Sequence, residues 1–308
     1  MSKIATFLKY IWILVVIVFV FAYFYEHYDT IINIVDLIPL INLTVAFLCI
    51  LLSKVLLSYV SLCSINYVGA NMPYDRMFSI YNMAQLAKYI PGSVWQFVQK
   101  SIAYSSKGMT LLEVKKSILI EVILVLSSAF FLGILLVLLD NFLDIKPMIS
   151  SLRQYYIYYS VLFILVILLT MFFYKKTWSI LSPLFHYPGI SIRAFSTLLF
   201  VWILLGFSFY ITLTPYLENT DTRLILSIVG LYAFAYALGF IVPFAPAGIG
   251  IREAILVAGI SNLVTIDYAI ILASLNRMIY IIVEVIVVFL ILLFSNVTKV
   301  LGNIPRKI

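Results

Sequence analysis

The succession of apolar segments is the feature that most constrains how this chain can fold. Each segment is close to the ~20 residues that an α-helix needs to cross a bilayer, and short polar stretches separate one segment from the next. Hydrocarbon offers no partner for exposed backbone groups, so segments of this length cross as helices. We therefore predict an all-α polytopic membrane protein with a single integral membrane domain over residues 1–308. The seven predicted spans are residues 1–27, 38–66, 116–139, 155–174, 195–214, 223–242 and 268–294.

Composition and charge exclude several other classes of protein. Hydrophobic residues make up 64% of the chain and charged residues 11%, which leaves too little polar surface for a soluble fold. The formal charge of +7 comes mostly from Lys and Arg beside the ends of apolar segments, where anionic lipid attracts them, so we expect no nucleic-acid partner. The two cysteines, Cys49 and Cys63, have no metal-type spacing. We expect no metal and no cofactor.

Two segments are apolar but interrupted, which is typical of broken or re-entrant helices. Residues 77–106 contain Pro91 and Gly92, and residues 246–264 hold most of a second break, which runs from Pro243 to Gly250. Paired Gly/Pro breaks in corresponding positions of two halves are a pointer to a transporter binding site. The two stretches YNMAQLAKYIPGSVWQ and YAFAYALGFIVPFAPAGIGIRE are similar enough to suggest weak repeats over 38–139 and 195–294, hence two pseudo-symmetric halves; chance similarity is the alternative.

Basic residues near the ends of spans indicate the orientation. An inside N-terminus with seven crossings would place the basic C-terminal residues outside, so we favour an eighth crossing by residues 246–264 as a short, tilted helix. This predicts about eight crossings in the cell (plasma) membrane with both termini cytoplasmic. The residues assigned to the cytoplasmic side are Lys3, Lys9, Lys100, Lys107, Lys115, Lys116, Lys175, Lys176, Arg193, Lys299, Arg306 and Lys307.

A helix that restarts after a break presents free N–H groups and the positive end of its dipole, which suits an anion. Ser93 is placed as an N-cap, and Gln96 follows on the new helix, while Gln85 belongs to a polar stripe upstream of the break. After Pro246, the glycines Gly248 and Gly250 permit close backbone approach, and Arg252 in the next turn could bind a phosphate. The alternative is that each break is only a turn between two spans.

Ionisable residues within spans are costly and normally face the protein interior or a water-filled cavity. Glu121 and Glu284 are the clearest cases, and Arg252 and Arg277 are the predicted partners, with Glu253 in the same network. A purely structural ion-pair cluster is the alternative. Lys54 and Lys88 are interpreted as lysines that snorkel to the interface. Tyr280 shares a helical face with Arg277 and Glu284, and Trp95 is a candidate for stacking on a sugar, although an interfacial or packing role is favoured for aromatic residues here.

These residues resemble a known family, the multispan membrane domain of lysyl-phosphatidylglycerol synthases and the stand-alone membrane proteins that share it. The resemblance rests on YIPGSVWQ with the downstream Glu121, on PAGIGIREA and on NRMIYIIVE. The usual second block begins Pro-Gly-Gly, and here Ala247 replaces the first glycine, which would be strained if that position needs a positive φ. The soluble aminoacyl-transferring domain has no counterpart before Ile308, so a stand-alone member is expected.

By resemblance, the chain is expected to be a flippase-like lipid translocase with no catalytic residues. Its substrate would be an anionic or zwitterionic lipid: a phospholipid, an aminoacyl-phospholipid or a polyprenyl-phosphate-linked glycan. One alternative is a non-catalytic membrane subunit of a glycolipid or polysaccharide assembly system, with a glycosyltransferase or lipid synthase as partner. A membrane-embedded lipid-modifying enzyme is the other, although no catalytic motif is present. The sequence leaves the oligomeric state open.

Overall fold

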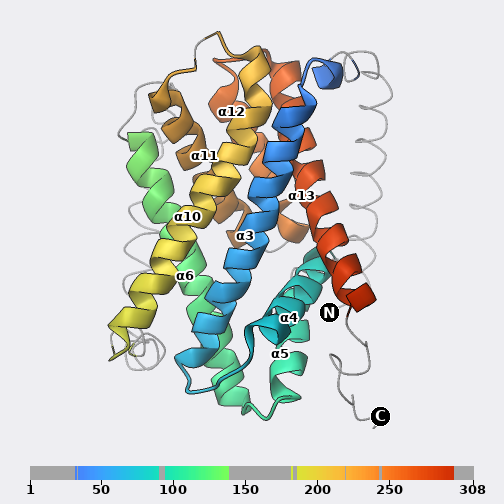
Figure 1. Cartoon of the computed structure of the whole chain (residues 1–308). Helices are drawn as coiled ribbons and strands as arrows, with labels where there is room; N and C mark the ends of the chain where they lie inside the picture. Colours follow the sequence, from blue (N-terminus) through green and yellow to red (C-terminus); the bar gives the residue numbers. More distant parts are fainter. Residues whose placement is uncertain are drawn as a thin grey trace, which may run out of the picture.

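The computed structural model describes residues 32, 34–89, 94–138, 182, 186–218, 220–242 and 245–294. In this part of the chain the elements are helices joined by short loops, and no β-strand is present (Figure 1). The α-helices are α3 (Leu40–Asn66), α4 (Tyr74–Leu86), α5 (Trp95–Ser105), α6 (Leu111–Leu138), α10 (Pro188–Leu213), α11 (Thr222–Ile241), α12 (Ile251–Ile260) and α13 (Ile266–Phe294). Three 3-10 turns join them: η1 (Ala87–Tyr89), η2 (Thr214–Tyr216) and η3 (Pro246–Gly248).

Five helices, α3, α6, α10, α11 and α13, are long and apolar enough to cross a membrane. They confirm the prediction of an all-helical membrane protein and coincide with five of the seven predicted spans. The other two predicted spans, residues 1–27 and 155–174, lie outside the described residues.

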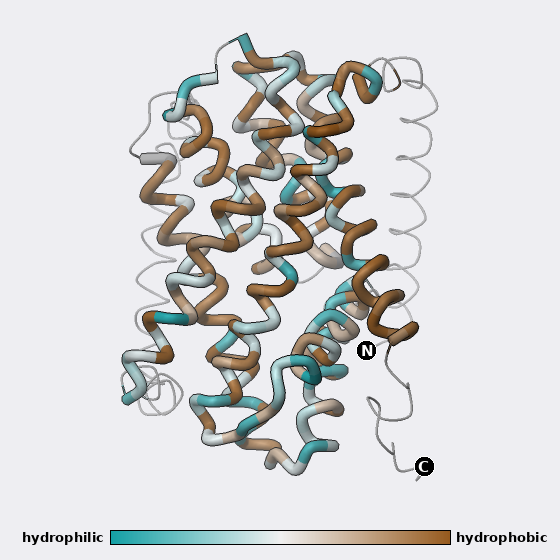
Figure 2. The backbone as a smooth tube through the Cα atoms, viewed as in Figure 1, coloured by the Kyte–Doolittle hydropathy of each residue, from teal (hydrophilic) through white to brown (hydrophobic). Residues whose placement is uncertain are grey.

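The distribution of polar side chains is that of a protein surrounded by lipid. Large apolar side chains such as Leu48, Phe131 and Phe289 are exposed on the long helices. Figure 2 shows hydrophobic residues prevailing along α13 and the upper parts of the long helices, whereas hydrophilic residues gather on α4 and the adjoining loops. Many polar residues are instead buried, among them Ser58 and Ser61 on the inner face of α3. An apolar exterior around buried polar groups needs a low-dielectric surrounding to be stable.

Close helix packing fixes one side of the bundle. A Cβ atom on Gly206 of α10 would lie 2.5 Å from Cα of Val229 on α11, and one on Gly133 of α6 would lie 2.9 Å from the backbone nitrogen of Phe234. Small residues at such crossings let helix backbones approach closely, which is how helices associate in lipid. The helices α6, α10 and α11 therefore form a tight wall.

Shorter elements form two hairpins whose tips meet. The helix α4 ends in η1, and α5 then runs back beside α4, whereas α11 leads through η3 into α12, which runs back beside α11. In Figure 1, α4 and α5 occupy the lower half of the molecule and α12 the upper half. The tips η1 and η3 pack against each other. The two breaks predicted from the sequence thus lie together, although ~150 residues of chain separate them.

The two halves of the bundle use the same set of packing relations. In the first half α3 packs on α4 and α6, and α5 packs on α6; in the second, α10 packs on α11 and α13, and α12 packs on α13. Contacts between the two halves are matched in the same way. The helix α4 of the first half packs on α13, α11 of the second half packs on α6, and α3 packs on α10. The colours in Figure 1 show that α3 and α10 run in opposite directions, as do α6 and α13.

The predicted crossing by residues 246–264 is not confirmed. The helix α12 has 10 residues, which at 1.5 Å per residue span about 15 Å, half of the ~30 Å hydrocarbon core. A turn over residues 261–264 ends α12, and α13 begins at Ile266.

Candidate functional site

Glu284 is the centre of a buried charge cluster. Its Oε1 accepts hydrogen bonds from Nζ of Lys54 on α3 and from Nζ of Lys88 on η1, both at 2.5 Å. Its Oε2 accepts a hydrogen bond from the Tyr89 hydroxyl at 2.7 Å. The Lys54 side chain is fully buried, and that of Glu284 is 2% exposed. One carboxylate therefore holds two ammonium groups and ties η1 to two of the long helices.

Glu121 forms a second and separate cluster. Its Oε1 accepts a hydrogen bond from Nζ of Lys100 on α5 at 2.5 Å, and its Oε2 accepts one from the Ser61 hydroxyl of α3 at 2.9 Å. The Ser61 hydroxyl also lies 3.1 Å from the Tyr104 hydroxyl. This cluster contains one cation and one carboxylate, so it is electrically balanced.

The predicted pairing of both carboxylates with arginines is therefore wrong. Lysines bind them instead, and the interpretation of Lys54 and Lys88 as snorkelling residues is also wrong, because both are buried. Lys100, which was assigned to a cytoplasmic flank, is 3% exposed and lies inside the bundle. The sequence did carry a signal for Lys54: together with Ser58 and Ser61 it forms a polar stripe at i, i+4 and i+7 on one face of α3.

Arg252 lies in a cage of aromatic rings. The centroids of the Tyr232, Tyr236 and Tyr280 rings lie 5.0, 4.8 and 5.8 Å from its Cζ atom, within the range of a cation–π interaction. Its side chain passes close to the backbone of Gly239, where a Cβ atom would lie 2.6 Å from the Arg252 Cγ. None of the ion pairs formed by the described residues includes Arg252. The guanidinium is thus surrounded by rings rather than held by a carboxylate at ion-pair distance.

Arg277 reaches the loop of the second break. Its Nη2 donates a hydrogen bond to the Ala247 carbonyl oxygen at 2.8 Å, and its Nε lies 3.8 Å from Oε1 of Glu253. The predicted proximity of Arg277 and Glu253 is confirmed at the distance of an ion pair, which is longer than a hydrogen bond. The buried Nε and Nη1 atoms have no hydrogen-bond partner. The Arg277 side chain is 9% exposed, so most of its guanidinium is enclosed by the protein.

The loop at η3 has the shape that the sequence predicted to be strained. Ala247 has φ 54° and ψ 19°, and it is the one residue other than glycine with positive φ in the described part of the chain. Gly248 has φ 71°, and a Cβ atom there would lie 2.9 Å from the Gly239 carbonyl oxygen, so glycine is required. Gly250 also has positive φ, and its N–H donates to Oε2 of Glu253 at 2.7 Å. The turn directs the Ala247 carbonyl toward Arg277 and places Arg252 in the first turn of α12.

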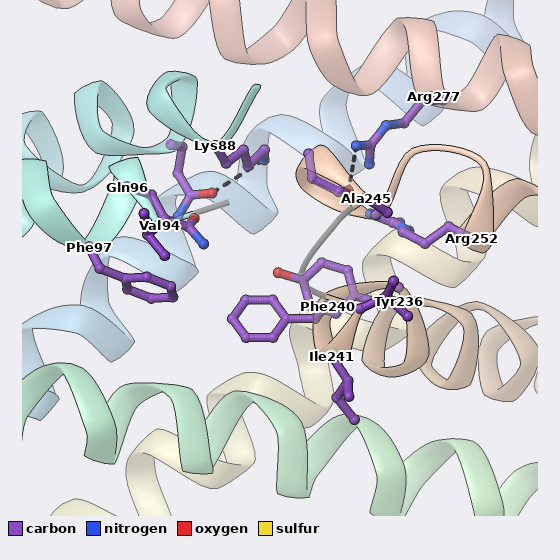
Figure 3. A pocket seen from close by; sticks show the side chains of 15 residues that line it. Lys88, Val94, Gln96, Phe97, Tyr236, Phe240, Ile241, Ala245, Arg252 and Arg277 are labelled. Carbon is purple, nitrogen blue, oxygen red and sulfur yellow. Dashed lines mark hydrogen bonds between the residues drawn. The ribbon is translucent and has the colours of Figure 1, made fainter. Parts of the chain in front are cut away.

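A cavity of about 180 Å³ lies between the two hairpin tips. Figure 3 shows Lys88, Val94, Gln96 and Phe97 on one side of it, facing Tyr236, Phe240, Ala245, Arg252 and Arg277 on the other. The helices α5 and α12 both begin at this cavity, so the positive ends of two helix dipoles face it. Three cations and two helix starts give the cavity a positive electrostatic character.

A smaller cavity of about 30 Å³ adjoins the first one. The rings of Phe97 and Phe240 line both cavities and pack edge to face with centroids 6.4 Å apart. The ion pair of Lys100 and Glu121 lies on the wall of the smaller cavity. Gln85, Gln96 and Tyr236 also line both cavities, so the two cavities share one wall.

Most of the predicted site residues that the structure describes lie at or next to the larger cavity. Gln85, Gln96, Arg252, Arg277 and Gly248 line it, and Tyr280 and Glu284 hold residues of its wall. Trp95 is 45% exposed and lines neither cavity, so the stacking role is not supported. Pro91, Gly92, Ser93 and Pro243 lie outside the described residues, as does the side chain of Pro246.

The buried charges do not balance. Among the described residues, the five cations Lys54, Lys88, Lys100, Arg252 and Arg277 are buried, whereas the carboxylates near them are Glu121, Glu284 and the partly exposed Glu253. Two positive charges are in excess. Because burying an unpaired charge is costly, such an excess is typical of a site whose ligand supplies the missing negative charge.

No protein-family model matches the chain, and a comparison with curated proteins finds no matching relative, so the resemblance to the lysyl-phosphatidylglycerol synthase membrane domain stays a prediction from its motifs.

Proposed function

We propose that this protein is a lipid translocase that moves a lipid with an anionic or zwitterionic headgroup between the two leaflets of a membrane. The observation that carries the proposal is the cationic cavity where the two hairpin tips meet, because an excess of two buried positive charges beside two helix starts requires an anionic ligand. The other groups that line the cavity, such as Gln96, can replace the water that a polar headgroup loses.

The proposed topology has six crossings and two re-entrant hairpins. It assigns α11, which is long enough to cross, to the second hairpin because α12 packs back against it. Four crossings are α3, α6, α10 and α13, and two are the predicted spans 1–27 and 155–174. The hairpin of α4 and α5 enters from the side where α3 ends, and that of α11 and α12 enters from the opposite side. An even number of crossings places both termini on one side without an eighth crossing. The exposed Arg193 and Lys115 lie near the starts of α10 and α6, and both helices start at the lower end of the bundle in Figure 1, which fits a cytoplasmic side there.

The acyl chains of the lipid have a route beside the cavity. Val94 and Ile241 line the cavity and are also 55% and 52% exposed on the surface of the bundle. An apolar rim that reaches from the cavity to the surface lets a headgroup enter while its chains stay in hydrocarbon. The headgroup then meets the Arg252 and Arg277 guanidinium groups.

Movement between leaflets follows from the matching halves. We infer an inverted repeat in which α3, the first hairpin and α6 correspond to α10, the second hairpin and α13. Exchanging the conformations of two such halves turns a cavity open to one leaflet into a cavity open to the other, which is the alternating access of transporters built from inverted repeats. The rings of Phe97 and Phe240, which line both cavities, would have to move apart in this exchange.

The test is leaflet exchange of a labelled lipid in vesicles that contain the purified full chain. Arg252→Gln removes one uncompensated charge from the cavity, and Arg193→Gln removes an exposed charge from α10 as a matched control. We expect Arg252→Gln to slow exchange by at least about tenfold, because a charge-assisted hydrogen bond to a buried ligand is worth ~1.5–3 kcal/mol, and we expect the control to exchange lipid like the unmodified chain.

Other outcomes distinguish the alternatives. Equal exchange by both variants would remove Arg252 from the site. Chemical modification of the headgroup would instead indicate a lipid-modifying enzyme. No exchange and no modification, in vesicles where the protein is folded, would favour a membrane subunit that needs a glycosyltransferase or lipid-synthase partner.

A further inference from the structure

The charges around the larger cavity define what kind of anion it takes. Four cations belong to this region, Lys54, Lys88, Arg252 and Arg277, and two carboxylates, Glu284 and Glu253, lie within ion-pair distance of three of them. The ion pair of Lys100 and Glu121 is balanced and adds nothing. Two positive charges therefore remain at this one cavity.

Common lipid headgroups differ in the amount of negative charge that they carry. A phosphodiester with a neutral alcohol carries one negative charge, whereas a phosphate monoester carries about −1.5 to −2 at pH 7 because its second pKa is ~6. A monoester also presents three acceptor oxygens. Donor-bearing side chains line the cavity: the guanidinium groups of Arg252 and Arg277, the ammonium of Lys88 and the amide of Gln96.

Deepening the function proposed above, on which this inference rests, we propose that the headgroup recognised by this cavity is a terminal phosphate monoester of a lipid, bound between Arg252 on α12, Arg277 on α13 and Lys88 on η1. The guanidinium groups of Arg277 and Arg252 donate to the phosphate oxygens, and Arg252 has no carboxylate of the described residues within ion-pair distance. Lys88 keeps its bond to Glu284 and adds an ammonium at the cavity wall.

The experiment compares two lipids with identical acyl chains, one ending in a phosphate monoester and one in a glycerol phosphodiester. Vesicles with the full chain are assayed for binding and leaflet exchange of each lipid. We expect the monoester to bind at least about tenfold more tightly, since one additional charge interaction in a buried site is worth about a factor of ten.

Two variants change the preference in opposite directions. Arg277→Gln lowers the excess charge to one and should reduce the preference for the monoester by about tenfold or more, while retaining exchange of the diester. Glu253→Gln raises the excess to three and should therefore increase the preference for the monoester. The turn should keep its shape, because Gln can still accept the hydrogen bond from the Gly250 N–H. Arg193→Gln, exposed on α10, should leave the preference unchanged.

The outcomes separate the two proposals. Equal binding and exchange of the two lipids would overturn the monoester assignment and leave the translocase intact. If inorganic phosphate displaces the labelled monoester lipid at concentrations equal to those of the unlabelled lipid, and no lipid moves, the cavity is a site for the free anion and the lipid assignment is overturned. If neither lipid binds or moves in vesicles with folded protein, the proposed function itself fails.

Discussion

The two buried carboxylates, Glu121 and Glu284, lie in similar surroundings but serve different ends. Both accept a lysine at 2.5 Å and a hydroxyl from a neighbouring side chain. Glu121 has one cation, whereas Glu284 has two, one of which, Lys88, also lines the cavity. The comparison teaches that a buried acid by itself does not mark a ligand site; an imbalance between neighbouring cations and acids does.

The largest effect is expected from Glu284→Gln. Removing this carboxylate leaves the ammonium groups of Lys54 and Lys88 together without an anion, and loss of one partner of a buried ion pair costs ~3–5 kcal/mol. We expect a large fall in the thermal unfolding temperature and in the yield of folded protein, measured by size exclusion in detergent. A variant with unchanged stability would show that the two lysines do not depend on Glu284.

Replacing both members of the balanced pair should have a much smaller effect. The double variant Lys100→Met with Glu121→Leu removes both charges and keeps similar volumes, and such replacements are often neutral or stabilising, by ~1–4 kcal/mol. We expect folded protein that still moves lipid, although the freed Ser61 hydroxyl limits the gain. Each single replacement should be less stable than the double variant. If the double variant folds but has lost exchange, Lys100 and Glu121 belong to the transport path.

The smallest effect is expected at the second break. Ala247 adopts a left-handed conformation in which glycine carries no steric cost, so Ala247→Gly should stabilise the protein by about 1 kcal/mol. The Ala247 carbonyl would still accept the hydrogen bond from Arg277, so headgroup binding should stay as it is. A small rise in the unfolding temperature with unchanged lipid exchange is the expected result. A lower unfolding temperature would mean that the alanine methyl group makes contacts worth more than the strain.

Much of the fold could be predicted because long apolar segments leave few choices. Hydropathy identified α3, α6, α10, α11 and α13, since helix length is fixed by membrane thickness. The breaks could be located because proline and glycine interrupt helices for local reasons. The meeting of η1 and η3 could be suspected from their related sequences, but the contact itself is tertiary.

The partners of the charged residues could not be predicted in the same way. A sequence shows which residues are ionisable, and spacing shows which share a helix face, but the pairing of Glu284 with Lys54 and Lys88 joins three separate elements. Arginine was expected as the partner because two arginines lie near the second break. Their guanidinium groups instead face tyrosine rings and a backbone carbonyl, which hydropathy does not encode.

The contact between the tips of the two hairpins has an electrical consequence. Where a wet cavity reaches inward from one side, the insulating layer is no longer the whole hydrocarbon thickness but the few residues at η1 and η3. In the proposed topology a membrane voltage would fall mainly across this thin layer and would act on each charge there with about 2.3 kcal/mol per 100 mV. For a doubly charged headgroup that passes the tips, this energy would be twice as large, so the resting voltage of a cell would bias the direction of lipid transport.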